Sequence, residues 1–197
     1  MARVHLLAGL SWRIGITRVV PATWRDKERL PVCFSSDGME IHAELRVIVE
    51  TLERASIDYA LCGGLAVAFH GYVRFTQDID LLVRREDVDR VTAEVAKCGY
   101  RDSSGKISLG EEELRRVLKT DGTDYLALDL VVLGSSLLDV WEERELFDWE
   151  GVPIWVVSAE GLARMKRRAG RDQDMLDLKK LGFTEESLED DAPNEDG

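Results

Sequence analysis

The hydrophobic pattern of the chain becomes regular only from residue 39 onward. Apolar positions there follow the three-to-four spacing of a helix with one buried stripe, carried by Ile41, Leu45, Ile48 and Leu52. The stretch "DYALCGG" at 58–64 then predicts a short buried strand that ends at two glycines. A short helix, "LAVAFHG", and a second strand, "IDLLV" at 79–83, are expected to follow.

The second half of the chain continues the alternation of helices and strands. Apolar spacing predicts a helix over 88–98, with Gly99 at its C-terminal cap. Residues 101–124 are polar and ambiguous, and we interpret them as a strand or loop followed by a short helix at "EEELRRVLK". The strongest strand pattern is "YLALDLVVL" at 125–133. The stretch "FDWEGVPIWVV" predicts a hairpin that turns at Glu150-Gly151.

Two helices are expected at the end of this region, one that begins after Ser158 and one that begins at Asp172 and ends at Gly182. The fold class is therefore α/β (α+β), with a mixed twisted sheet flanked by helices and followed by C-terminal helices. We predict three parts: a poorly structured N-terminal extension over 1–38, one domain over 39–182, and an acidic disordered tail over 183–197. The start codon at residue 1 or at Met39 is left open.

Charge and composition narrow the functional class. The formal net charge is −12, and over half of this excess lies in the tail "TEESLEDDAPNED". No apolar run approaches the roughly 20 residues of a membrane span, and arginines interrupt the apolar N-terminal residues, so neither a membrane anchor nor export is expected. The three cysteines are widely spaced and odd in number, which favours reduced thiols and a cytoplasmic location.

The chemistry of the chain is concentrated around one strand and the turn before it. Asp78 and Asp80 lie two residues apart on a predicted strand, so both side chains leave the same face and can hold one cation. The Gly63-Gly64 turn offers backbone N–H groups for a phosphate. Asp129 stands alone in an apolar strand, where a shared metal site would offset the cost of burial. Each feature has a structural alternative: an ordinary turn, a solvated strand edge, or a loop cap.

Two residues between the turn and the acidic strand are further candidates. The Arg74 guanidinium could meet a triphosphate, and a surface salt bridge is an equal alternative. Thr76 lies in the same segment and is included among the candidate nucleotide contacts.

The order and spacing of these residues resemble the DNA polymerase beta type nucleotidyltransferase superfamily. The text "GGLAVAFHGYVRFTQDIDLLV", with "VVSAEGLARMKRRAGRDQDMLDLKKL" downstream, is similar to small prokaryotic nucleotidyltransferases of the abortive-infection and toxin–antitoxin (MNT-like) kind, over roughly 40–182. The resemblance implies that Gly63 and Gly64 contact nucleotide phosphates, and that Lys166 reaches the triphosphate. Many relatives carry serine where this chain has Gly64.

The same resemblance implies metal-ion catalysis by the acidic residues. Asp78 and Asp80 would bind the metal, and Asp129 would share the metal site and help to activate the acceptor hydroxyl. The expected cofactor is Mg²⁺ or Mn²⁺, and the expected substrate is an NTP.

We therefore expect a nucleotidyltransferase that moves a nucleoside monophosphate from an NTP to a hydroxyl, in a toxin–antitoxin or phage-defence setting. A non-catalytic nucleotide- or partner-binding module and a small-molecule (antibiotic-type) nucleotidyltransferase are the alternatives. An acidic domain without a long basic groove is poorly suited to hold a polynucleotide. The expected acceptor is a protein hydroxyl, such as that of a cognate toxin or antitoxin, with a tRNA end or a small molecule as alternatives. The base of the NTP is not predicted.

Overall fold

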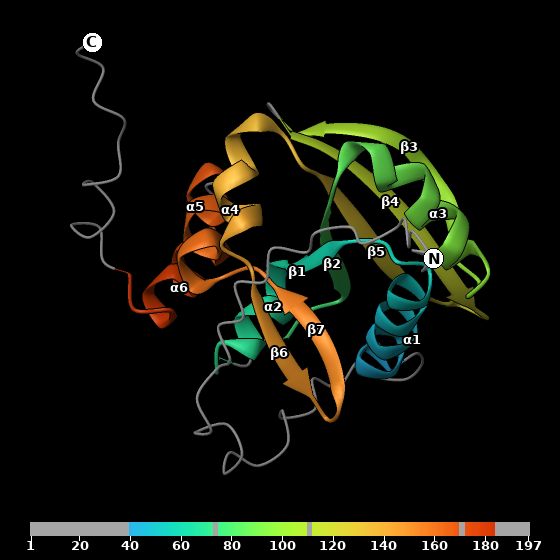
Figure 1. The fold of residues 1–197 in the computed structure, drawn as a ribbon, viewed down its shortest axis with the longest axis horizontal. Helices are drawn as coiled ribbons and strands as arrows, with labels where there is room; N and C mark the ends of the chain where they lie inside the picture. Colours follow the sequence, from blue (N-terminus) through green and yellow to red (C-terminus); the bar gives the residue numbers. More distant parts are fainter. Residues whose placement is uncertain (1–39, 73–74, 110–111, 170–171, 184–197) are drawn as a thin grey trace, which may run out of the picture.

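The structure is a computed structural model, and it describes four parts of the chain: residues 40–72, 75–109, 112–169 and 172–183 (Figure 1). The predicted N-terminal extension, Arg74, and the predicted acidic tail apart from Phe183 lie outside the described residues.

A seven-stranded mixed sheet forms the centre of the molecule, with the strand order β3-β4-β5-β2-β1-β7-β6. Its strands are β1 (Tyr59–Cys62), β2 (Asp78–Val83), β3 (Arg101–Leu109), β4 (Glu112–Asp121), β5 (Asp124–Val132), β6 (Glu145–Trp149) and β7 (Val152–Val156). The pairs β2/β5 and β1/β7 are parallel, and the other four pairs are antiparallel. The predicted mixed sheet is confirmed.

Six α-helices and two short 3₁₀ helices are present among the described residues. They are α1 (Ile41–Arg54), α2 (Gly63–Phe69), η2 (Arg85–Asp87), α3 (Val88–Ala96), η3 (Ser135–Leu137), α4 (Leu138–Glu142), α5 (Ala159–Ala169) and α6 (Asp172–Lys180). Helices α1 and α3 pack together, whereas α4, α5 and α6 form a separate group (Figure 1). Within the described parts of the chain, no helix has the length and apolar character needed to cross a membrane.

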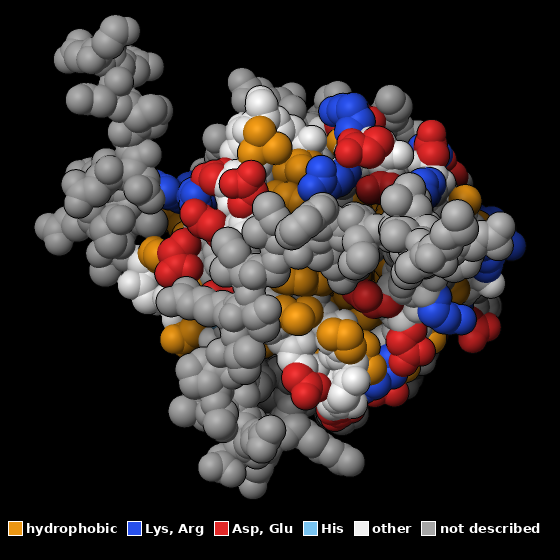
Figure 2. Space-filling model, in the orientation of Figure 1, with side chains coloured by type: hydrophobic (Ala, Val, Ile, Leu, Met, Phe, Trp, Pro, Cys, Tyr) orange, Lys and Arg blue, Asp and Glu red, His pale blue; other side chains and the backbone are white. Residues whose placement is uncertain are grey.

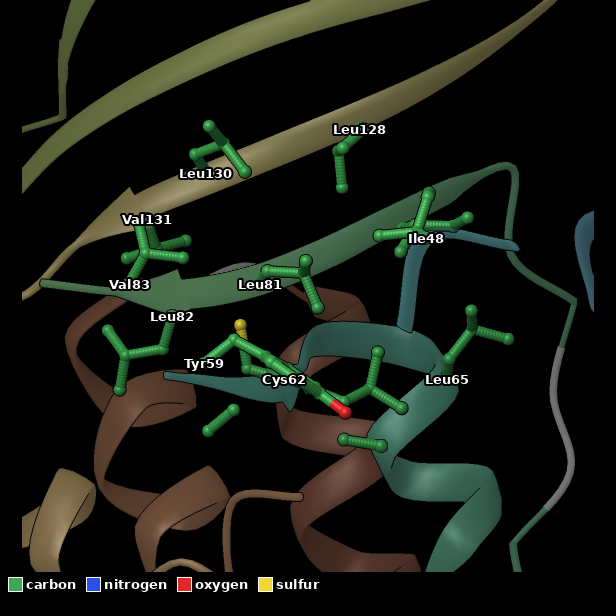
Figure 3. Close-up of a cluster of buried hydrophobic side chains, with 14 of the residues drawn as sticks. Ile48, Tyr59, Cys62, Leu65, Leu81, Leu82, Val83, Leu128, Leu130 and Val131 are labelled. Carbon is green, nitrogen blue, oxygen red and sulfur yellow. The ribbon is translucent and has the colours of Figure 1, made fainter. Parts of the chain in front are cut away.

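The core forms where α1 and α3 cover the apolar face of the sheet. Residues of β2 alternate, so that Ile79 and Leu81 are fully buried while the aspartates between and before them lie on the other face. Figure 3 shows part of this cluster, with Leu81 of β2 and Leu128 of β5 near Ile48 of α1. Burial of these strands on one face fixes the direction in which the acidic side chains leave the sheet.

The prediction of a helix at "EEELRRVLK" is wrong. Residues 101–109 and 112–121 form the antiparallel strands β3 and β4, and residues 122–123 form the turn to β5. In β4 the side chains alternate, because Val117 is fully buried and its neighbour Arg116 points to the opposite face, toward Asp129. Cross-strand pairing with β3 and β5 therefore outweighs the helix propensity of the Glu, Leu, Arg and Lys residues in this stretch.

Three other predicted turns and caps are confirmed. The β6–β7 hairpin turns at Glu150-Gly151, both of which have positive φ, as a type I′ turn requires. The Ser158 hydroxyl accepts a hydrogen bond from the Gly161 N–H at 3.1 Å and so caps α5. Gly99 ends the α3 region with a φ of +99°.

Candidate active site

One row of residues crosses four neighbouring strands at the site. Asp80 of β2 lies opposite Asp129 of the parallel strand β5. Asp129 in turn lies opposite Arg116 of β4, and Asp80 lies opposite Cys62 of β1. Because residues in register point to the same face of a sheet, the pairing brings the two carboxylates and the guanidinium together.

The three predicted acidic residues form one cluster. Each of Asp78, Asp80 and Asp129 offers a carboxylate oxygen, and these oxygens all lie within 4.8 Å of one another. Asp129 is only 3% exposed, whereas the other two are half-buried. Carboxylate oxygens are the donors that hard divalent cations prefer, and partial exposure leaves room for water and substrate oxygens. The cluster therefore fits an ion such as Mg²⁺ or Mn²⁺.

Gly63 makes the close approach of Asp80 possible. It is the first residue of α2 and has a φ of +63°. A Cβ built at this position would overlap the Asp80 carboxylate and lie 2.8 Å from Asp80 Cβ. Glycine is thus needed here for two reasons: the left-handed backbone, and the space that the Asp80 carboxylate fills.

The remaining predicted contacts around the turn are placed as follows. The Thr76 side chain is buried, and its hydroxyl donates to Asp78 Oδ1 at 2.9 Å, so it orients that carboxylate. Gly64 is buried in the first turn of α2. The position of Arg74 is outside the described residues.

The sequence reading missed Arg116. Its Nε and Nη2 atoms donate to the two oxygens of Asp129, each at 2.6 Å, and Nη2 lies 4.0 Å from Asp78 Oδ2. The hydrogen bonds to Asp129 raise the pKa of Arg116, as do the charges of Asp129, Asp78 and Asp80, although partial burial opposes the shift. One signal could have found this residue. The two-residue turn Gly122-Thr123 predicts a hairpin in which Asp121 pairs with Asp124. Counting back along both strands from that pair sets Arg116 opposite Asp129.

Lys166 lies in a buried ion-pair cluster between α5 and α6. Its ammonium donates to Asp177 at 2.7 Å and to Asp174 at 3.2 Å. All three side chains are at most 10% exposed. A lysine held in this way joins the two last helices, and its predicted contact with a triphosphate stays a prediction.

We expect Lys166→Met to lower the free energy of unfolding by about 3–5 kcal/mol, because two buried aspartates each lose their ion pair with the Lys166 ammonium. Lys180→Met is the matched control, since Lys180 is exposed on α6 and its replacement should change stability by less than about 0.5 kcal/mol. Urea unfolding of both variants measures the difference. A folded Lys166→Met protein of parental stability, with a raised KM for the NTP, would instead support the triphosphate contact.

Comparison with protein families gives an independent view of the same region. The model of the aminoglycoside-2''-adenylyltransferase family matches residues 44–181, which is most of the chain and includes every described residue of the acidic cluster and the glycine turn. No curated protein sequence matches the chain.

Solved structures show the same fold. A Thermotoga maritima protein assigned to the nucleotidyltransferases superposes with a TM-score of 0.54 and 16% identity, over 72% of this chain and 91% of that one. The solution structure of the antibiotic-resistance factor ANT(2'')-Ia gives a TM-score of 0.54 at 14% identity, over 75% and 86% of the two chains. The crystal structure of ANT(2'')-Ia with adenylyl-2''-tobramycin gives 0.50 at 15% identity, over 71% and 85%.

The comparisons support the predicted superfamily and refine the predicted subtype. The family and the solved structures are nucleotidyltransferases, as the resemblance implied. The toxin–antitoxin subtype finds no support among them, and the family that matches is one of antibiotic adenylyltransferases.

Proposed function

The chain belongs to the aminoglycoside-2''-adenylyltransferase family, and from this premise we propose that it transfers the AMP group of ATP to a hydroxyl of a small, hydroxyl-rich molecule. The reaction forms a bond between the acceptor oxygen and the α-phosphorus, and it releases pyrophosphate. The proposal rests above all on one observation, which is the register of Asp80 with Asp129 on adjacent parallel strands. That register, with Asp78 two residues away, gathers three carboxylates where a nucleotide can meet them.

In this proposal the acidic residues hold a divalent cation beside the reacting phosphate. Asp78 and Asp80 supply ligand oxygens, and the Thr76 hydroxyl fixes the orientation of Asp78. A bound Mg²⁺ or Mn²⁺ would neutralise charge on the phosphates and bring the acceptor and leaving oxygens into line. Asp129, whose two oxygens accept from Arg116 in this structure, is assigned to share the cation and to take the proton of the acceptor hydroxyl.

The glycine turn is assigned to the phosphates. Gly63 begins α2 directly beside Asp80 and Gly64 follows it, so their N–H groups are the ones we assign to the phosphates of a nucleotide at the cation site. Backbone N–H groups at a helix start attract anions, and the absence of side chains lets phosphate oxygens approach. Arg74 remains a predicted contact of the triphosphate.

Charge favours a small cationic acceptor over a polymer. Where side chains of the described residues are visible in Figure 2, Asp and Glu are interspersed with Lys and Arg, and the visible basic side chains form no continuous stripe. The net charge of −12 repels a nucleic-acid backbone and attracts an amine-bearing molecule. A small acceptor with amino groups, as in the aminoglycoside class, therefore fits better than the protein hydroxyl that the sequence first suggested.

The test is direct transfer with purified protein. Each of the four NTPs, labelled at the α-phosphate, is incubated with Mg²⁺ or Mn²⁺ and either an aminoglycoside panel or host lysate. We expect label from ATP to move to the 2''-hydroxyl of an aminoglycoside, with a mass increase equal to AMP less water. The matched control is the same acceptor without its 2''-hydroxyl, which should gain no label.

Other destinations of the label decide between acceptors. Label in lysate that protease releases would contradict the small-molecule acceptor and would favour the toxin–antitoxin setting. Label that ribonuclease releases would favour a tRNA end. Binding of ATP without transfer to any acceptor would favour the non-catalytic module, against which the complete acidic cluster argues.

A further inference from the structure

Arg116 occupies the carboxylate that the proposed reaction requires. Its guanidinium donates to both oxygens of Asp129 in a bidentate pair, with each N···O distance at 2.6 Å. Such pairs are among the strongest that side chains form, and this one lies on a carboxylate that is almost fully buried. The guanidinium also reaches within 4.0 Å of Asp78, so it lies among the acidic residues rather than behind them.

A guanidinium in this position competes with a metal ion. Mg²⁺ needs ligand oxygens at about 2.0–2.1 Å, and two positive groups on one carboxylate repel each other strongly where water is scarce. The cluster contains three carboxylates and one guanidinium, which leaves the charge of two carboxylates for one divalent ion to neutralise. The Arg116 side chain is 40% exposed, whereas that of Asp129 is 5% exposed, so the guanidinium has a route away from the cluster into solvent.

We propose that Arg116 is a built-in competitor of the divalent cation at Asp129. In the free protein the guanidinium holds Asp129, and a divalent ion binds through Asp78 and Asp80 alone. Asp129 becomes a metal ligand only when Arg116 leaves it. The inference rests on the proposed function in one respect, because it takes these three aspartates as the metal site.

The experiment measures Mn²⁺ binding to the protein without nucleotide, by electron paramagnetic resonance of free Mn²⁺. Arg116→Gln removes the positive charge and leaves a shorter polar side chain. We expect this variant to bind Mn²⁺ at least about tenfold more tightly than the parent, because the ion gains Asp129 and loses a repulsive neighbour. Its melting temperature should also rise more on addition of Mn²⁺ than that of the parent, because the ion replaces the missing cation beside a buried carboxylate.

Two further variants control for indirect effects. Arg116→Gln combined with Asp129→Asn removes the whole pair, and its Mn²⁺ affinity should return to the parental range because only Asp78 and Asp80 remain. Arg116→Lys keeps the charge and loses the bidentate geometry, so its affinity should fall between those of the parent and Arg116→Gln. If Arg116→Gln does not fold, Arg116→Lys still tests the inference, because it should bind Mn²⁺ more tightly than the parent, and parental or weaker binding would overturn the inference.

The outcomes separate the inference from the proposed function. If Arg116→Gln binds Mn²⁺ no more tightly than the parent, while Asp80→Asn weakens binding, the competitor role is wrong and the metal site stands. Weaker binding by Arg116→Gln would likewise overturn the inference, since it would make Arg116 an orienting partner of Asp129. If neither the parent nor any variant binds Mn²⁺, both the inference and the proposed metal site fail.

Discussion

Asp78→Asn and Asp80→Asn should each reduce nucleotidyl transfer by more than about a hundredfold. The loss of a metal ligand should exceed the loss of an outer partner of a metal site, which reaches about a hundredfold. An amide keeps the size of the carboxylate but lacks the charge that holds a divalent cation. The Thr76 hydroxyl can still donate to the amide oxygen at position 78, so that contact survives the change. Transfer of labelled AMP at saturating ATP measures the effect.

The fold should be unaffected by either substitution, because removing one charge from a cluster of three carboxylates relieves repulsion. Asp121→Asn is the matched control, since Asp121 is exposed at the end of β4 in the same sheet. It should leave transfer and the melting temperature unchanged. If folded Asp80→Asn protein transfers AMP at the parental rate, the metal assignment is wrong.

Local pattern was sufficient to predict which residues share a face of one strand. The spacing of Asp78 and Asp80 on an apolar strand determines that both leave the same side, whatever the strand's partners are. The single aspartate in "YLALDLVVL" was identified in the same way. Neither pattern could give the register between the two strands, which are parallel and separated in the chain by α3, β3 and β4.

The wrong prediction of a helix in residues 101–124 explains why Arg116, the positive charge beside the three carboxylates, was missed. Once "EEELRRVLK" was interpreted as a helix, Arg116 had no defined neighbour on β5. Helix propensity is a weak guide for such a stretch because it omits the hydrogen bonds that two flanking strands supply. The two-residue turn after Asp121 was the better signal, since a hairpin of this length fixes every cross-strand pair that follows it.

A cluster of basic residues in a sequence does not show which of them form ion pairs within the fold. Lys166 was assigned to a triphosphate from its place in a resembling motif, yet its ammonium contacts Asp174 and Asp177 of the next helix. Sequence alone cannot distinguish a lysine that points to a ligand from one that is buried between helices, because both occur at helical spacing in basic stretches.

Gly63→Ala should abolish transfer and destabilise the fold, and the effect should exceed that of an alanine substitution at any other glycine of positive φ in the described residues. The added methyl group would overlap the Asp80 carboxylate, so Asp80 must rotate away from the metal site or the start of α2 must shift. Either change separates Asp80 from Asp129 and removes a ligand oxygen. The positive φ of Gly63 adds about 1–2 kcal/mol, because an L-residue is strained in this region.

Gly151→Ala separates these two causes. Gly151 also has a positive φ, at +82°, but a Cβ there would meet nothing within 4 Å, and the β6–β7 turn lies at the edge of the sheet. This variant should therefore lose about 1–2 kcal/mol of unfolding free energy and keep full transfer activity. Gly63→Ala should lose more stability than this control, and should lose Mn²⁺ binding as well.

A double-mutant cycle then identifies Asp80 as the group that Gly63 accommodates. In an Asp80→Ala background the carboxylate is absent and only the Cβ contact at 2.8 Å remains, so Gly63→Ala should destabilise the protein less than it does in the parent. Unfolding in urea of the four proteins gives the coupling free energy. An equal loss in both backgrounds, or parental transfer by Gly63→Ala, would show that the glycine serves only the backbone of the turn, and that the acidic cluster does not depend on the space that glycine leaves.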